Sequence, residues 1–371
     1  MILHLSHSAG AVDGGIATAV AGLVEAQRLE GASAGWITAD QHPAWRRDLL
    51  LRDQVLHLAP DLVHLHGLWR SPTRIAPALA RKGLPLLIAP HGMLDPWALA
   101  YSRRRKAVVW RLWERRALEA ASCLQALCPA EAEAIRALGI STPIAVIPNG
   151  VNLPDPSRGP LPPPPWSGIV PPGEKVLLFL GRFHAKKGLR PLLTAWAAIE
   201  EEALRAGWWL VLVGYGDGGA TASAVAAAGL QRCRVYGPCF GEHKEACLSA
   251  SSAFVLPSFS EGLPMAALEA MSRGLPCLLS PECHLEEAVI AGAALSVRPE
   301  VKELRNGIRR LFAIGEPERM QRGKAGRQMV ISHYSWNVMV SRIAELHRWL
   351  LIGGLSPAFM ELGERCVEGA A

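Results

Sequence analysis

Residues 256–280, L-P-S-F-S-E-G-L-P-M-A-A-L-E-A-M-S-R-G-L-P-C-L-L-S, carry the pattern that best indicates the fold of this chain. The apolar run 253–256 predicts a buried strand that ends at Pro257, and a short polar loop with Glu261 follows. Pro264 suits the first position of a helix, where its missing N–H costs no hydrogen bond. A strand, loop and helix in this order are typical of α/β sheets, which bind ligands outside the carboxyl ends of their strands.

Glu261 and Glu269 are the acids of this stretch, eight residues apart. In one interpretation Glu261 caps the helix start and Glu269 lies in water. In the other, both carboxylates point into one crevice. We favour the second, because the loop is stiffened by Gly262 and Pro264 and because Glu269 lies in an otherwise apolar segment, where a charge is costly without a partner.

The spacing E-x7-E inside P-S-x-x-E-G-x-P-x-x-x-L-E-A-M-x-x-G-x-P resembles the signature of retaining GT-B glycosyltransferases of family 4, also called glycosyltransferase group 1. The resemblance implies an α/β fold in which two Rossmann-like domains face each other across a cleft, with a C-terminal helix that crosses back to the first domain. It also implies transfer of a hexose from a UDP- or GDP-linked sugar, as co-substrate, to a glycan or lipid-linked acceptor. Retention of anomeric configuration through front-face attack, and independence of metals and cofactors, are further implications.

Composition agrees with a globular enzyme of two domains. The chain has 371 residues, of which 50% are hydrophobic and 19% charged, so it can bury two cores. The first residues lack the basic start of a secretory signal, and no apolar run approaches the ~18 residues that span a bilayer. Eight cysteines are scattered without a C-x-x-C pair, which indicates neither a zinc site nor disulfides. We therefore expect a cytoplasmic protein.

Alternating strand and helix patterns divide the chain in two. In the first half we expect strands at residues 2–6, 61–66, 84–89 and 144–147. In the second half we expect strands at 176–180, 209–213, 234–236, 253–256 and 275–279. The expected parts are a first domain of residues 1–160 completed by a crossover helix at 336–350, a proline-rich linker at 161–173, a nucleotide-sugar domain at 174–335 and a mobile tail at 354–371.

Three features of the first half are candidates for a site. Gly14 and Gly15 lie between a strand and a helix, a place where backbone N–H groups bind anions, and by resemblance this loop approaches the donor phosphates. His66 and His91 each end a strand and precede a glycine. His91, in P-H-G-M, resembles the family's active-site histidine beside the transferred sugar, and His66 is a weaker candidate.

Residues 101–116 carry seven basic groups and one acid, a net charge of +6 that equals that of the whole chain. Val109, Trp110, Leu112, Trp113 and Ala117 recur at helical spacing. One interpretation is an ordinary helix with its apolar side on the sheet. The other is a basic, tryptophan-bearing face that contacts anionic headgroups at the inner membrane surface or a lipid-diphosphate acceptor. The acceptor or membrane contacts would be His66, Arg103, Arg104, Arg105 and Lys106.

The loop G-R-F-H-A-K-K-G at 181–188 precedes a helix and suits a diphosphate. Arg182 can make a bidentate contact and Lys187 can act as a point charge, with Lys186 as an alternative. The loop also resembles the family's diphosphate loop.

The segment 214–219 matches G-x-G-x-x-G, but the next strand ends without the acid that a dinucleotide site requires, so we exclude NAD. By resemblance Gly214 lies near the nucleoside, and Val235, Tyr236 and Gly237 contact its base.

The expected roles follow from this resemblance and from charge. Arg182 and Lys187 would stabilise the departing diphosphate. Glu261 would hold sugar hydroxyls, with help from the backbone N–H groups near Gly262 and Leu263, and Glu269 would hold the ribose.

Three alternatives are less favoured. A glycoside hydrolase with two acids explains neither the cationic loop nor the two Rossmann-like halves. A sugar-nucleotide epimerase or phosphorylase of the same fold would share the donor site. A nucleic-acid binder would use residues 101–116, but basic and aromatic residues do not interleave elsewhere, so we expect no nucleic acid.

Overall fold

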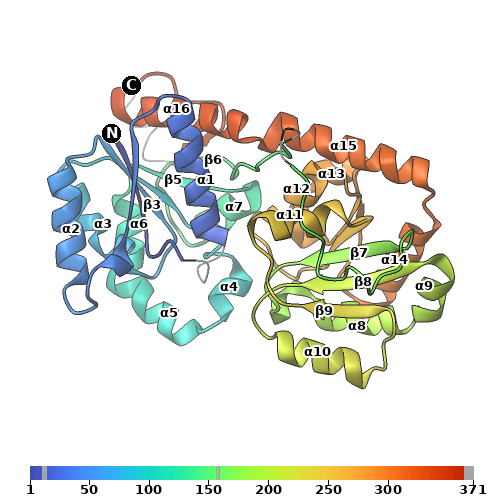
Figure 1. Cartoon of the computed structure of the whole chain (residues 1–371). Coiled ribbons are helices and arrows are strands. Elements are labelled where there is room, and N and C mark those ends of the chain that lie inside the picture. Colours follow the sequence, from blue (N-terminus) through green and yellow to red (C-terminus); the bar gives the residue numbers. More distant parts are fainter. Residues whose placement is uncertain (11–14, 156, 158, 363–371) are drawn as a thin grey trace. The chain divides into compact units, whose positions relative to one another are not determined.

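The computed structural model describes residues 1–10, 15–155, 157 and 159–362 (Figure 1). Its contacts divide the chain into two compact units. The first contains Met1–Gly150 and Tyr334–Ala371, and the second contains Val151–His333. Both units are α/β with parallel sheets, as the alternation of the sequence predicts.

The first unit is built on a seven-stranded sheet in the described part of the chain, with strand order β13-β6-β5-β4-β3-β1-β2. Its strands are β1 (Ile2–Ser6), β2 (Ala34–Thr38), β3 (Leu62–His66), β4 (Leu86–Ala89), β5 (Cys123–Ala126), β6 (Ile144–Val146) and β13 (Met360–Glu361). All neighbours are parallel except β13, which pairs antiparallel with β6. Chain order reverses beside β1, so the loops after β1 and β3 flank the point where ligands bind in such sheets.

Helices cover both faces of this sheet (Figure 1). Their bounds are α1 (Gly15–Leu29), η2 (Ala39–Gln41), α2 (Arg47–Leu58), α3 (Ser71–Ala80), α4 (Pro96–Ala100), α5 (Arg103–Val109), η3 (Trp110–Glu114), α6 (Arg115–Ala120), α7 (Pro129–Ala137) and α16 (Trp336–Ile352). Side chains of a strand alternate between faces. The apolar residues of β3 are therefore divided between two cores: Val63 and Leu65 pack with α2, α3 and α6, whereas Leu62 packs with α1 and α16.

Helix α16 completes the first unit, as the predicted crossover requires. Its first residue, Trp336, fills a space that two glycines leave open. A Cβ atom at Gly22 or at Gly150 would overlap the indole ring of Trp336. Gly150 belongs to the P-N-G-V sequence after β6, so small residues at both positions let the returning helix dock.

The second unit is built on a six-stranded parallel sheet in the described part of the chain, with strand order β12-β11-β10-β7-β8-β9. Its strands are β7 (Lys175–Leu180), β8 (Trp208–Val213), β9 (Cys233–Tyr236), β10 (Ala253–Leu256), β11 (Cys277–Leu279) and β12 (Ala294–Ser296). Its helices are η4 (Ala185–Lys187), α8 (Leu189–Ala197), α9 (Glu200–Ala206), α10 (Gly218–Ala227), α11 (Gly241–Ser249), α12 (Met265–Ser272), η5 (Pro281–Cys283), α13 (Glu286–Ile290), α14 (Val301–Ala313) and α15 (Glu316–Tyr334). Chain order reverses between β7 and β10, which places their loops side by side.

Two expectations about the ends of the domains change. The first unit ends at Gly150, ten residues before the expected boundary at 160, and the segment expected as a linker, 161–173, belongs to the second unit. Trp166 of that segment is buried and its ring lies 6.4 Å from that of Tyr236, so side-chain packing anchors the proline-rich run. The tail expected to be mobile from residue 354 contains β13, which hydrogen-bonds to the first sheet.

The basic segment is not one regular helix. A π-helical turn, η3, interrupts it between α5 and α6. The extra residue of this turn shifts the phase of the helix, so Leu112, expected on the sheet side, is 59% exposed, while Glu114 is fully buried. The expected apolar stripe is therefore wrong at Leu112.

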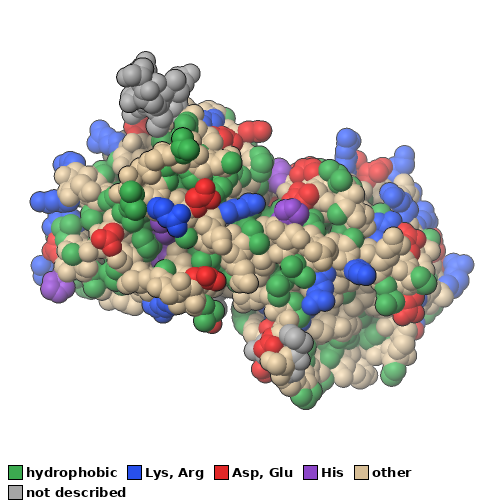
Figure 2. Space-filling model, turned by 90° about the horizontal axis from the view of Figure 1, so that it is seen from above, with side chains coloured by type: hydrophobic (Ala, Val, Ile, Leu, Met, Phe, Trp, Pro, Cys, Tyr) green, Lys and Arg blue, Asp and Glu red, His purple; other side chains and the backbone are tan. Residues whose placement is uncertain are grey.

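No helix among the described residues is both long and apolar enough to cross a bilayer. Basic, acidic and apolar side chains are interspersed on the face of the molecule in Figure 2.

Candidate functional site

In the second unit, the loops after β7 and β10 carry the predicted diphosphate and acidic residues. These strands are neighbours, at the point where the chain order of the sheet reverses. The loops are fastened together: the N–H of Phe259 donates to the carbonyl of Lys186 over 2.7 Å. Gly188 has φ +67°, and a Cβ there would overlap the carbonyl oxygen of Pro257. The glycines of the sequence therefore allow the two loops to meet backbone to backbone.

The contact at the centre of this edge joins Lys187 to Glu261. Lys187 Nζ lies 2.5 Å from Glu261 Oε1, and Ser258 Oγ donates to the same oxygen over 2.5 Å. Glu261 is buried, and Lys187 is largely buried. Burial alone would raise the pKa of Glu261, but Lys187, Lys186 and Ser258 outweigh it and hold this pKa below its usual value. Glu261 is therefore a carboxylate at neutral pH.

Arg182 lies in the same loop as Lys187 but is exposed. Its guanidinium has no hydrogen bond or ion pair to another side chain in the described part of the chain. Burial, with Arg182, Lys186 and Lys187 nearby, lowers the pKa of His184. An arginine without an acidic partner, beside other cations, is suited to bind an anion.

Glu269 does not lie alone in water. It is on α12, which begins at Met265, one residue after the predicted start, and its Oε1 accepts from Lys244 Nζ over 2.7 Å. Both side chains are partly buried. Glu269 thus has the partner that a charge in apolar surroundings needs. That partner is Lys244 on α11, which we did not predict from the sequence.

The other candidates of the second unit lie at the same edge of the sheet. Gly214 follows β8, and a Cβ there would overlap the carbonyl oxygen of Gly181. Val235 and Tyr236 end β9, and Gly237 follows them. Burial raises the pKa of Tyr236, whose hydroxyl has no partner among the described residues. The remaining two, Gly262 and Leu263, lie in the loop between Glu261 and α12.

In the first unit, His66 and His91 lie at the ends of neighbouring strands and touch each other. His66 Nδ1 and His91 Nε2 are 3.0 Å apart. The array continues inward, since His66 Nε2 lies 3.0 Å from His4 Nδ1 and His4 Nε2 lies 2.7 Å from Gln27 Oε1. The structure thus joins a weak and a strong candidate of the sequence in one hydrogen-bonded chain.

Two buried acids hold the turns that carry these histidines. Trp69 and His91 have left-handed backbones, with φ +69° and +56°. Such conformations cost about 1–3 kcal/mol in non-glycine residues and cluster at functional sites. Glu114 accepts from the N–H of Trp69 over 3.0 Å, and Glu131 accepts from the N–H of Gly92 over 2.5 Å.

Burial raises the pKa of both Glu114 and Glu131 to about 7, although hydrogen bonds to each act in the opposite direction. These acids were not predicted, although Glu131 in the first turn of α7 is a visible signal.

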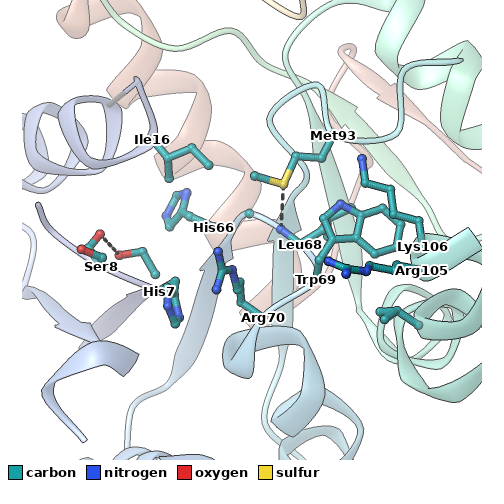
Figure 3. A pocket seen from close by; sticks show the side chains of 13 residues that line it. His7, Ser8, Ile16, His66, Leu68, Trp69, Arg70, Met93, Arg105 and Lys106 are labelled. Carbon is teal, nitrogen blue, oxygen red and sulfur yellow. Dashed lines mark hydrogen bonds between the residues drawn. The ribbon is translucent and has the colours of Figure 1, made fainter. Parts of the chain in front are cut away.

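A pocket of about 340 Å³ opens beside His66, and all of its lining residues belong to the first unit. In Figure 3, His7 and Ser8 lie on one side of it, Arg105 and Lys106 lie on the other, and Arg70 lies between. Burial lowers the pKa of Lys106, whose Nζ donates to the carbonyl of Ala98 over 2.6 Å. Two of the predicted basic residues, Arg105 and Lys106, therefore line a pocket together with His66.

The remaining candidates of the first unit lie elsewhere or outside the described residues. Arg103 and Arg104 are exposed on α5 and do not line the pocket. Gly15 is the exposed first residue of α1, and Gly14 lies outside the described residues.

One cluster in the described part of the chain has the spacing of a metal site. One ring nitrogen from each of His4, His64 and His66 lies within 4.8 Å of the other two. Both nitrogens of His4 and both of His66 already take part in hydrogen bonds, whereas neither nitrogen of His64 has a partner among the described residues. The hydrogen bonds leave this cluster without a free set of ligands.

Family models match residues of both units. A model of glycosyl transferases group 1 matches residues 166–329, and a model of glycosyltransferase family 4 matches residues 14–154. A curated relative, UDP-Gal:alpha-D-GlcNAc-diphosphoundecaprenol alpha-1,3-galactosyltransferase of Escherichia coli, is 64% identical over 33 residues. That match covers 9% of this chain and 8% of the relative's length.

Solved structures share the fold over nearly the whole chain. Sucrose-phosphate synthase from Thermosynechococcus elongatus superposes with a TM-score of 0.73 and 21% identity, covering 95% of this chain and 100% of that chain. WaaG, a glycosyltransferase involved in lipopolysaccharide biosynthesis, superposes with a TM-score of 0.70 and 15% identity, covering 95% of this chain and 100% of that chain. HepE of Anabaena, solved with UDP and glucose, superposes with a TM-score of 0.70 and 17% identity, covering 93% of this chain and 98% of that chain. The chain therefore has the GT-B fold and belongs to the group 1 glycosyltransferases of family 4.

Proposed function

We propose that the protein transfers a hexose from a nucleoside-diphosphate sugar to a lipid-linked, phosphate-bearing glycan acceptor in the assembly of a surface polysaccharide, lipopolysaccharide or glycolipid. The observation that supports it most is the cationic loop of the second unit. There Arg182 has no acidic partner among the described residues, and Lys187 lies against the buried carboxylate of Glu261. A group that gains negative charge as it leaves would be stabilised at this loop.

The chemistry follows from the charges. The bond between the anomeric carbon and the diphosphate breaks as a bond to an acceptor hydroxyl forms on the same face, and the hydroxyl proton passes to the departing phosphate oxygen. Arg182 and Lys187 would carry the leaving group's charge without a metal, and one such donor is worth roughly 2.7–4 kcal/mol in comparable sites. Glu261, kept ionised by Lys187, can accept hydrogen bonds from sugar hydroxyls. Glu269 would hold the ribose, and Val235–Gly237 would meet the base.

The acceptor side of the proposal rests on the pocket beside His66. Arg70 and Arg105 line it, and neither side chain has an acidic partner among the described residues. Two free guanidinium groups suit phosphate oxygens, which accept bidentate hydrogen bonds. The relative from Escherichia coli is named for an acceptor in which a sugar is linked through diphosphate to a lipid. A similar acceptor could place its phosphate near Arg105 and its sugar near His66.

The exposed side chains of segment 101–112 fit an acceptor with a lipid tail. Tyr101, Val108 and Leu112 are 65%, 57% and 59% exposed, beside Arg103 and Arg104. Apolar and basic side chains that share one exposed segment bind anionic membrane surfaces. We propose that the protein acts in the cytoplasm, in peripheral contact with the inner face of the membrane.

Release of nucleoside diphosphate tests the function. Purified protein is incubated with UDP- and GDP-linked hexoses, with and without a lipid-diphosphate sugar, and the released nucleotide and the anomeric configuration of the product are measured. We expect release only with acceptor, an unchanged anomeric configuration and resistance to a chelator. Glu261→Gln should keep nucleotide binding and lose turnover by orders of magnitude. Turnover of the donor without acceptor would instead indicate an epimerase, and near-normal turnover of Glu261→Gln would refute the role of Glu261.

A further inference from the structure

The face of the first sheet that α1 and α16 cover contains a row of histidines. Positions 62, 64 and 66 of β3 share this face because strand side chains alternate, and the β1 register sets His4 opposite His64. His4, His64 and His66 are all buried. Only two of the three belong to the hydrogen-bonded chain, which runs from Gln27 on α1 through His4 and His66 to His91.

The three histidines of this chain are neutral at physiological pH. Burial lowers the pKa of His91 to about 4. Burial also lowers the pKa of His4 to about 4, against the opposing effect of its bond to Gln27. The pKa of His66 lies well below its usual value, because of burial first and of the neighbouring His4 and His91 next. A neutral imidazole has one N–H donor and one acceptor nitrogen, so the tautomer of one ring decides which nitrogen of the next ring carries the proton.

The direction of the chain is set at its inner end. Gln27 presents its amide oxygen, which only accepts, so His4 Nε2 must carry the proton. His4 Nδ1 then accepts from His66 Nε2, and His66 Nδ1 accepts from His91 Nε2. This leaves the Nδ1 atom of His91 unprotonated. In the described part of the chain no group donates to that atom.

We infer that Gln27, His4 and His66 are positioning residues that hold His91 in one tautomer, with Nε2 protonated and Nδ1 as a hydrogen-bond acceptor. The inference rests on the proposed function in one respect: the acceptor atom serves the reaction by receiving a hydrogen bond from a hydroxyl of the transferred sugar. A histidine free to exchange tautomers would present an acceptor for only part of the time.

The chain does not conduct protons, because its inner end is an amide, which does not take up a proton near neutral pH. It is also incompatible with a metal on His4 and His66, since a metal would need the nitrogens that the hydrogen bonds use. The chain therefore fixes the orientation and tautomer of one ring. The hydrogen-bond partners of metal-binding histidines fix those rings in the same way.

Nitrogen NMR of the full-length protein with ring-labelled histidine tests the lock directly, because a protonated and an unprotonated ring nitrogen resonate far apart. His91→Asn identifies the signals of His91. We expect wild-type His91 to be protonated at Nε2 and not at Nδ1. Gln27→Met, which removes the acceptor but keeps a side chain of similar length, should give a mixture of tautomers. Gln27→Glu, which restores an acceptor oxygen, should return the single tautomer.

Gln125→Met is the matched control. Gln125 is also a buried glutamine of the first unit and loses a comparable hydrogen bond, from its Nε2 to the carbonyl of Ile147 at 2.8 Å. It should leave the His91 signals unchanged. The inference would be refuted if wild-type His91 were protonated at Nδ1 or if its signals were unchanged in Gln27→Met. Stoichiometric zinc in the purified protein would also refute it.

Kinetics separate this inference from the proposed function. We expect Gln27→Met to lower kcat about ten-fold at unchanged KM for the donor, as the loss of one hydrogen bond of about 1.4 kcal/mol would do. The same change should add nothing in a His91→Asn background. If the tautomers mix but kcat is unaffected, the lock stands and the role of His91 in transfer is refuted.

Discussion

Lys187 Nζ lies 2.5 Å from Glu261 Oε1, in an environment that leaves Glu261 7% exposed. The two residues come from loops 74 positions apart in the chain, which meet because β7 and β10 are neighbours in the sheet. The pair thus brings the basic loop and the acidic motif of the sequence into one site.

Removal of Lys187 should destabilise the second unit. Lys187→Met leaves a buried carboxylate without its cation, and breaking such pairs costs about 3–5 kcal/mol. Urea unfolding at pH 7 measures this loss.

The pH dependence of that loss has a definite sign. In the wild type, Lys187 helps to hold the pKa of Glu261 below its unfolded value, so the stability from this group is lost as the pH falls through the folded pKa. In Lys187→Met, burial raises the pKa of Glu261 instead. The difference in free energy of unfolding between wild type and variant should therefore shrink between pH 7 and pH 5. Lys186→Met, which keeps the hydrogen bond, is the control, and an equal loss in both variants would contradict a specific pair.

Arg105 should contribute to acceptor binding and not to donor binding. Arg105→Ala removes a cation from the pocket beside His66 and should raise the KM for a phosphate-bearing acceptor about ten-fold, since hydrogen bonds to charged groups are worth about 1.5–3 kcal/mol. Arg81→Ala, at an exposed arginine outside both the pocket and the basic segment 101–116, is the control. A rise in the donor KM with Arg105→Ala would assign the pocket to the donor instead.

His64 should destabilise the folded protein, because it is buried and lies outside the hydrogen-bonded chain of histidines. It is fully buried, and neither ring nitrogen has a partner among the described residues. His64→Leu should raise the free energy of unfolding at pH 7 by about 1–3 kcal/mol, the usual cost of an unpaired buried polar group. Chemical unfolding with His57→Leu, at an exposed position, as control measures this difference.

The free energy of unfolding of His64→Leu should also depend less on pH in the acid range. Burial first, and then His66, His4, His347 and His91, hold the pKa of His64 well below 6.5. The unfolded chain therefore binds a proton that the folded chain does not, and stability is lost as the pH falls below about 6.5. His64→Leu removes one such group, so its stability should fall less steeply between pH 6.5 and pH 4 than that of the wild type. A steeper fall would show that His64 is paired in the folded state.

Much of the fold could be predicted because its signals are local. Apolar runs such as 253–256 form buried strands, and glycines and prolines mark the loops, so the two α/β halves and the returning helix at Trp336 follow from short patterns. The basic loop 181–188 and Glu261 became site candidates in the same way, because each lies in the loop that follows a strand.

The rest depended on contacts between distant segments. Nothing near Glu269 in sequence indicates Lys244, and nothing near Gly92 indicates Glu131. The π-helical turn that buries Glu114 has no sequence signal, because tertiary packing decides where a helix accommodates an extra residue. A cluster of histidines could have been suspected, since His4 and His64 occupy matching positions in two neighbouring parallel strands and His66 lies on the same face as His64. Its direction could not, because it is set by Gln27 on α1.

Calorimetric titration of Arg182→Ala with a nucleoside diphosphate and with the matching nucleoside tests whether the loop after β7 binds the diphosphate of the donor. Arg182 contributes to the affinity for a nucleoside diphosphate, and not for a nucleoside, if the loop after β7 binds the diphosphate of the donor. We therefore predict at least ten-fold weaker binding of UDP or GDP, whichever the wild type binds, with unchanged binding of uridine or guanosine. Arg190→Ala, at an exposed arginine on the neighbouring α8, should alter neither affinity. If Arg182→Ala weakened nucleotide and nucleoside binding equally, or weakened neither, the loop after β7 would not be the diphosphate site.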